Sequence, residues 1–140
     1  MPHTAVPASE LTARLNELRR VMSATHPDWK MILLDNKIDL YYFTGTMQEG
    51  ALVITPDEAA LFVRHSYECA VRDSRFPDIR PLGSFRGIAS AFPHIPETVY
   101  VATRTITLQK LAMLQKYLPF APASIDSILG GLRTVKSAYE

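Results

Sequence analysis

The sequence is poor in cysteine, in surplus charge and in long apolar runs, and each shortage excludes a class of protein. Its single cysteine, Cys69, can form neither an intrachain disulfide nor a thiolate zinc site, which excludes a disulfide-stapled secreted scaffold. Fifteen basic against fourteen acidic residues give a net charge of +1, which argues against a nucleic-acid binder that works by phosphate neutralisation. No apolar run approaches the roughly 18 residues of a membrane span, and residues 1–14 lack the regions of a signal peptide. We therefore expect a reduced, cytoplasmic domain with neither a nucleic-acid nor a membrane partner.

The chain has enough apolar residues for one core, since 47% of it is hydrophobic and only 21% is charged. Residues 1–8 show no periodicity and are expected to form a loose lead-in. A helix is predicted from Ser9, whose hydroxyl could serve as the N-cap. Its apolar stripe has helical spacing and consists of Leu11, Leu15, Leu18 and Met22. His26-Pro27 should end this helix, because proline cannot donate to the helical ladder.

Short apolar runs predict a sheet. Two of them flank Thr55-Pro56-Asp57-Glu58 and are typical of a hairpin. The predicted strands are residues 29–34, 51–54, 60–63, 79–82 at a sheet edge, and 98–102. The periodicity leaves the conformation of residues 36–45 open. Strands that alternate with helices indicate an α/β layered domain with a mixed sheet.

Four further helical segments are expected between and after these strands. Residues 66–74 would place Tyr67, Ala70 and Val71 on one face, and residues 85–92 suit a short helix. Thr107 can cap a third helix, whose stripe is Leu108, Leu111, Leu114 and Leu118. A proline-broken stretch follows at residues 119–122, and residues 125–139 favour a helix interrupted at Gly130-Gly131.

Residues that could carry chemistry are present but not grouped. The four histidines, His3, His26, His65 and His94, have no metal-ligand spacing, so we expect each to face solvent or to be structural, although a metal site built from distant residues stays open. His65 next to Ser66 is no catalytic triad, since no orienting acid is identifiable. Cys69 has no cation beside it that would stabilise a thiolate, and we expect a small core residue.

Three other patterns also favour structural roles. Gly45 and Gly50 are spaced like a phosphate loop but lack the lysine and the following helix that bind phosphate. The aromatic run 41–43 could stack on bases or sugars. Because the charge of the chain is balanced, we expect these rings to pack within the protein or an interface instead. A solvated helix face is expected for Arg14, Arg19 and Arg20, which lie beside Glu10 and Glu17. No self-sufficient catalytic constellation emerges.

The order of the segments nevertheless forms a recognisable set. It consists of Arg14-Leu15 and Leu18, Ile32-Leu33-Leu34, Asn36, Ile38, Tyr42-Phe43-Thr44-Gly45, Ala51-Leu52-Val53-Ile54, Leu61-Phe62-Val63-Arg64, Tyr67, Ala70, Asp126, Ile128-Leu129, Leu132-Arg133 and Val135-Lys136-Ser137. In order and spacing, this set resembles the N-terminal domain of the creatinase, prolidase and aminopeptidase P family of Xaa-Pro peptidases, over about residues 9–140. Gly130-Gly131 departs from the family pattern, and at roughly 1 kcal/mol per glycine we expect the last helix to fray or break there.

The resemblance implies a fold and a domain organisation. The fold is a three-layer α/β sandwich with a mixed β-sheet and a ribonuclease H-like motif. Residues 1–8 would be the lead-in, 9–129 the creatinase/prolidase N-terminal-type domain, and 130–140 the start of a linker helix to a catalytic domain absent from this sequence. In the family, that absent domain holds two divalent metal ions (Mn, Co or Zn) with two Asp, a His and two Glu. We therefore expect neither a catalytic residue nor a cofactor in this chain.

The implied function is that of a non-catalytic domain within a hydrolase. The parent protein would be an Xaa-Pro dipeptidase-like metallopeptidase. This domain would support a homodimer, pack on its own C-terminal catalytic domain and shape the entrance for a proline-containing peptide. The alternative is a stand-alone peptide- or protein-binding module of the same family without activity, and an unrelated α/β domain is a third interpretation. The gene sequence beyond Glu140 would discriminate between the first two.

One loop is expected to approach substrate. In creatinases, the loop that precedes the second strand carries an aromatic residue and an arginine, whereas here Thr46-Met47-Gln48-Glu49-Gly50 has neither. The resemblance therefore favours a peptidase over a creatine hydrolase. Met47, Gln48 and Glu49 are expected to make peripheral contacts with substrate, in a loop that is exposed and mobile. A plain connecting loop is the alternative.

Overall fold

Six strands form one mixed sheet in the order β4-β3-β2-β1-β5-β6 in this computed structural model, which describes residues 6–46, 48–65 and 67–134. The strands are β1 (Ile32–Leu34), β2 (Gly50–Ile54), β3 (Ala59–Val63), β4 (Ile79–Pro81), β5 (Thr98–Val101) and β6 (Ala121–Ser124). β2 runs antiparallel to β1 and β3, and all other neighbours pair in parallel. Five strands therefore share one direction, and their carboxyl ends meet at one side of the sheet, here called the carboxyl edge.

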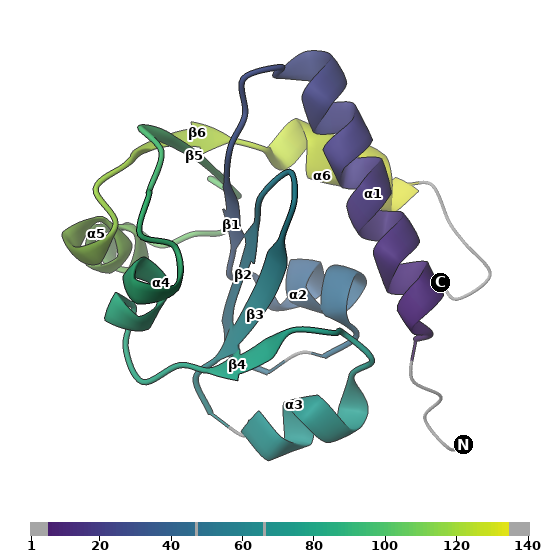
Figure 1. The fold of residues 1–140 in the computed structure, drawn as a ribbon. Helices are drawn as coiled ribbons and strands as arrows, with labels where there is room; N and C mark the ends of the chain where they lie inside the picture. Colours follow the sequence, from purple (N-terminus) through teal and green to yellow (C-terminus); the bar gives the residue numbers. More distant parts are fainter. Residues whose placement is uncertain (1–5, 47, 66, 135–140) are drawn as a thin grey trace.

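Helices cover both faces of this sheet (Figure 1). They are α1 (Ala8–Thr25), α2 (Lys37–Thr44), α3 (Tyr67–Asp73), α4 (Arg86–Ala91), α5 (Leu108–Tyr117) and α6 (Asp126–Thr134). α1, α2 and α6 share one core with the sheet, while α4 and α5 share a second core on the opposite face. The domain thus has the three-layer α/β sandwich that the resemblance implies.

Alternation along the central strands separates the two cores. In β1, Ile32 and Leu34 face the core under α1, whereas Leu33 faces the core under α4 and α5. β2 and β3 alternate in the same way, because successive side chains of a strand point to opposite faces. All three residues of β1 and all five of β2 are buried, as expected for strands covered on both sides.

Most predicted elements are confirmed. α1 ends at Thr25 with His26 as its C-cap, next to Pro27, and its stripe from Leu11 to Met22 is buried. The hairpin pairs Ile54 with Ala59, and β4 lies at an edge of the sheet. The Thr107 hydroxyl caps α5 by accepting a hydrogen bond from the Lys110 amide at 3.1 Å.

Several local predictions are wrong. Ser9 is not the N-cap of α1, because the helix already begins at Ala8 after Pro7 and has no side-chain cap. Leu108 and Val71 do not face a core, since they are 86% and 46% exposed. The stretch expected to be broken by proline overlaps the start of β6, where Pro122 is tolerated because an edge strand pairs on one side only.

The glycine pair does not interrupt the last helix. α6 continues through Gly130 and Gly131 to Thr134. Leu129 and Leu132 are buried on α6 within the core that also holds α1, and this packing outweighs the low helix propensity of glycine. The helix predicted for residues 135–139 lies outside the described residues.

The arginines of α1 do not form one solvated face. Arg14 is buried and lies 4.5 Å from the Tyr42 ring centre, and it donates to the Tyr42 carbonyl at 2.6 Å and to Glu10 at 3.3 Å. Arg19 is half-buried and contacts the β2–β3 turn. Only Arg20 is exposed, in an ion pair with Glu17.

Candidate functional site

The loop between α2 and β2 lies at the carboxyl edge of the sheet. β2 starts there because it runs against its neighbours, and its first residue, Gly50, pairs with Val63 at the end of β3. The Arg64 amide donates to the Glu49 carbonyl at 2.8 Å. This pairing joins the loop to the segment after β3.

The two ends of α2 determine where this loop begins. The Asn36 side chain accepts hydrogen bonds from the amides of Ile38 and Asp39, at 2.9 and 3.4 Å, and so caps the first turn. Gly45 ends the helix with a φ of 79°, a left-handed conformation that glycine adopts without strain. Asn36 and Gly45 were the available sequence signals for a helix in the segment that periodicity left open.

Buried hydroxyl groups anchor the first half of the loop. Ser74 donates to the Thr44 carbonyl, and its own hydroxyl accepts from the Phe76 amide at 3.0 Å. The Thr46 hydroxyl accepts from the Gln48 amide at 3.5 Å. The prediction of an exposed loop is therefore wrong for Thr46, which is only 4% exposed.

The second half of the loop is accessible. Gln48 is half-buried and Glu49 is exposed, whereas Met47 lies outside the described residues. Nε2 of His65 lies 4.0 Å from Oε2 of Glu49, and 71% of the His65 side chain is exposed. Sequence reasoning missed this neighbour, although the hairpin register brings the two residues together.

An amide, a carboxylate and an imidazole are therefore grouped at this edge. Gln48, Glu49 and His65 could bind polar ends of a ligand by hydrogen bonds, and a protonated His65 would pair with Glu49. No described serine, threonine or cysteine hydroxyl or thiol is hydrogen-bonded to His65 in the way that nucleophilic catalysis requires. The group offers hydrogen-bond donors and acceptors to a polar ligand.

Asp126 forms a hydrogen-bond cluster at the other end of the carboxyl edge, after β5 and β6. Its carboxylate accepts hydrogen bonds from Thr103 at 2.5 Å, Ser124 at 2.8 Å and the Arg104 amide at 3.2 Å. Burial alone would raise the pKa of Asp126, but these hydrogen bonds and the charge of Arg104 outweigh it and lower the pKa. This carboxylate connects β5, β6 and α6, which is a structural role.

The other residues considered for chemistry stay apart. Among the described residues, no group of three or more His, Cys, Asp or Glu side chains could hold a metal ion. Cys69 is half-buried rather than a core residue, and the expectation that no cation lies beside it is wrong, because the Arg72 guanidinium on the same helix interacts with its thiol. Within the aromatic run, Phe43 is buried and Tyr42 packs against the core, which leaves only Tyr41 substantially exposed. In the part of the chain that the structure describes, no helix combines the length and apolar character needed to cross a membrane.

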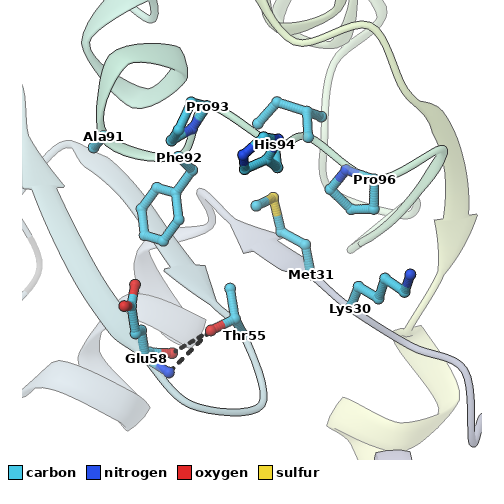
Figure 2. A pocket seen from close by; sticks show the side chains of 10 residues that line it. Lys30, Met31, Thr55, Glu58, Ala91, Phe92, Pro93, His94 and Pro96 are labelled. Atoms are coloured by element: carbon cyan, nitrogen blue, oxygen red, sulfur yellow. Dashed lines mark hydrogen bonds between the residues drawn. The ribbon is translucent and has the colours of Figure 1, made fainter.

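A pocket of about 680 Å³ opens at the opposite edge of the sheet. Figure 2 shows its walls, which come from the residues before β1, the β2–β3 turn and the connection from α4 to β5. It is lined by Lys30, Met31, Thr55, Glu58, Ala91, Phe92, Pro93, His94, Ile95 and Pro96. The sequence did not reveal this pocket, because three segments far apart along the chain form it.

Comparison with solved structures shows the same fold in Xaa-Pro peptidases. The chain is similar to a prolidase from Pyrococcus furiosus, with a TM-score of 0.75 and 23% identity over 90% of this chain and 39% of that one. An Xaa-Pro dipeptidase from Bacillus anthracis gives a TM-score of 0.79 and 16% identity, over 93% of this chain and 38% of that one. The chain thus spans about two fifths of the length of these two relatives.

A shorter relative is covered almost completely. The creatinase/prolidase N-terminal domain of an X-Pro dipeptidase from Streptococcus pyogenes has a TM-score of 0.71 and 17% identity, over 85% of this chain and 98% of that one. A comparison with curated proteins gave no match.

A family model provides the remaining evidence. The model described as the creatinase/prolidase N-terminal domain matches residues 14–135, which is most of the chain. The match begins at Arg14 within α1 and includes the whole sheet and α6. The chain belongs to the family of creatinase/prolidase N-terminal domains.

Proposed function

We propose that this chain is the non-catalytic N-terminal domain of an Xaa-Pro dipeptidase-like metallopeptidase. The observation that carries the proposal is the family match over residues 14–135. The similarity of fold to a prolidase and an Xaa-Pro dipeptidase supports the peptidase assignment over creatine hydrolysis. Hydrolysis of Xaa-Pro bonds belongs, in this proposal, to a cytoplasmic full-length protein whose C-terminal domain binds two divalent metal ions.

The domain has two roles in this proposal, which are support of a homodimer and formation of the substrate entrance. The accessible half of the α2–β2 loop supports the second role. Glu49 lies next to His65, the Gln48 amide donates to the Thr46 hydroxyl, and the buried hydroxyl of Ser74 holds the start of the loop in place. Because the loop is anchored, its polar side chains can contact the charged termini of a peptide without a large loss of conformational entropy on binding.

Kinetics of the full-length enzyme test the entrance role. Gln48→Ala and Glu49→Ala should each raise KM by about 2- to 10-fold, the effect of losing one hydrogen bond. They should leave kcat unchanged, because contacts made equally in the ground and transition states act on KM alone. Glu68→Ala is the matched control, since Glu68 is an exposed carboxylate on α3.

Two results would contradict this role. Unchanged KM and kcat across several Xaa-Pro substrates would mean that residues 46–50 are a plain connection. A fall in kcat with constant KM would mean that the loop acts on the chemical step. Sedimentation equilibrium tests the other role, because the full-length protein should have twice the mass of one chain, and a monomer at assay concentration would contradict it.

A further inference from the structure

We propose that the 680 Å³ pocket at the β2–β3 turn binds a short peptide with free termini and an apolar middle residue. The proposal goes beyond the function inferred above and does not depend on it. It rests on three observations about the pocket: its size and apolar floor, the charges at its rim, and the rigidity of one wall.

The floor of the pocket is apolar and well packed. Met31 and Phe92 are only 2% and 8% exposed, and Ile95 and Pro96 extend the apolar lining. At the roughly 30 Å³ that a water molecule occupies in the liquid, the volume holds about twenty non-hydrogen atoms. This is the size of a tripeptide, and the volume lies within the range of about 300–1,000 Å³ seen for ligand pockets.

Opposite charges flank this floor. Figure 2 shows Glu58 and Lys30 on either side of Met31, with Phe92 and His94 extending from the α4–β5 connection. A carboxylate and an ammonium separated by apolar surface complement a zwitterion with an apolar centre. The amino terminus of a peptide would lie beside Glu58 and its carboxylate beside Lys30. Glu58 would repel a ligand that carries only negative charge.

Hydrogen bonds within the β2–β3 turn and from α1 fix the wall that carries Glu58. Within the turn, the Glu58 amide donates to the Thr55 hydroxyl at 2.9 Å, and the Thr55 amide donates to the Glu58 carbonyl at 2.8 Å. From α1, Arg19 donates to the carbonyls of Thr55 and Glu58 at 3.1 and 2.9 Å. The backbone below the Glu58 side chain is therefore ordered before a ligand arrives, which reduces the entropic cost of binding.

Titration of the ¹⁵N-labelled chain with the tripeptide Ala-Leu-Ala tests the proposal. The amide signals of Lys30, Glu58, Phe92 and His94 should shift saturably, with half-saturation below about 1 mM for a ligand of this size. Acetylation of the amino terminus or amidation of the carboxyl terminus should each weaken binding by about 3-fold, as expected for the loss of one exposed ion pair.

Charge variants assign each terminus to its partner. Glu58→Gln should weaken binding of the free peptide by about 3-fold, so that the free and the acetylated peptide bind this variant equally. Lys30→Gln should also weaken binding of the free peptide by about 3-fold, so that the free and the amidated peptide bind that variant equally. Glu68→Gln and Lys37→Gln are the controls, because both residues are exposed outside the pocket lining. Three results would each overturn the proposal: no saturable shifts, blocked peptides that bind as tightly as the free peptide, or control variants that weaken binding as much as Glu58→Gln and Lys30→Gln.

Discussion

Gly50→Ala should destabilise the domain, because there is no room for a Cβ at the start of β2. That atom would collide with the Phe62 carbonyl oxygen and lie 3.0 Å from the Phe62 carbonyl carbon and 3.1 Å from the Val63 Cα. All three are backbone atoms of the paired strand, so no side-chain rotation can relieve the contact. Overpacking of this kind costs about 1–3 kcal/mol. With about 2 kcal/mol lost, the melting temperature should fall by roughly 8 °C.

Gly130→Ala is the matched substitution, and it should stabilise the domain. A Cβ at Gly130 meets nothing within 4 Å, and the residue lies inside α6. Alanine is favoured over glycine in a helix interior by about 0.8–1 kcal/mol, so the melting temperature should rise by roughly 3 °C. Thermal unfolding followed by circular dichroism measures both. A fully stable Gly50→Ala variant would refute the close approach of β2 and β3, and a destabilised Gly130→Ala variant would refute a continuous α6.

Three other predictions test the fold. Asn36→Ala should cost about 1 kcal/mol in urea unfolding, because it leaves two amides of the first turn of α2 uncapped, and no loss would mean that the cap is not formed. Leu15→Asp or Val53→Asp should abolish cooperative unfolding by placing an unpaired charge in a core, and ordinary stability would mean that these faces are exposed. Asp126 has a lowered pKa, so its contribution to stability should be present above its ordinary value of 3.8 and be lost as the pH falls through the folded pKa. The difference in melting temperature between wild type and Asp126→Asn should therefore shrink below about pH 4, and a constant difference would contradict the assignment.

The strands were largely predictable from the sequence, because the hairpin residues are apolar, bounded by turn residues and of strand length. β6 was not, since Pro122 is compatible with a strand only at a sheet edge, and edge position depends on the whole topology. α6 was expected to break because propensity is local, whereas the burial of Leu129 and Leu132 is not.

Arg14 shows how residue type can mislead. It lies three residues after Leu11 and four before Leu18, so helical spacing placed it on the buried face, while its charge suggested solvent. The Tyr42 carbonyl that accepts its hydrogen bond is 28 positions away and could not be predicted from α1 alone.

The candidate site was predicted in part. Gln48 and Glu49 could be located from the turn at Gly45 and the strand that follows. The position of His65 beside Glu49 follows from the pairing of β2 with β3. The hairpin prediction implied this pairing, but the pairing was not used to locate His65. The buried hydroxyl contact between Ser74 and Thr44 spans 30 positions and has no local signal.

The most direct test of the central claim is an activity comparison between two purified proteins. One is the chain of residues 1–140, and the other is the product of the complete reading frame. Both are incubated with Mn²⁺ or Co²⁺ and an Xaa-Pro dipeptide, and release of proline is measured. We predict metal-dependent hydrolysis by the complete protein and none above buffer by residues 1–140, because the proposed function assigns the metal-activated water to the C-terminal domain. Turnover by residues 1–140 alone, or no turnover by the metal-loaded complete protein, would contradict the claim, and the second result would favour the stand-alone binding module.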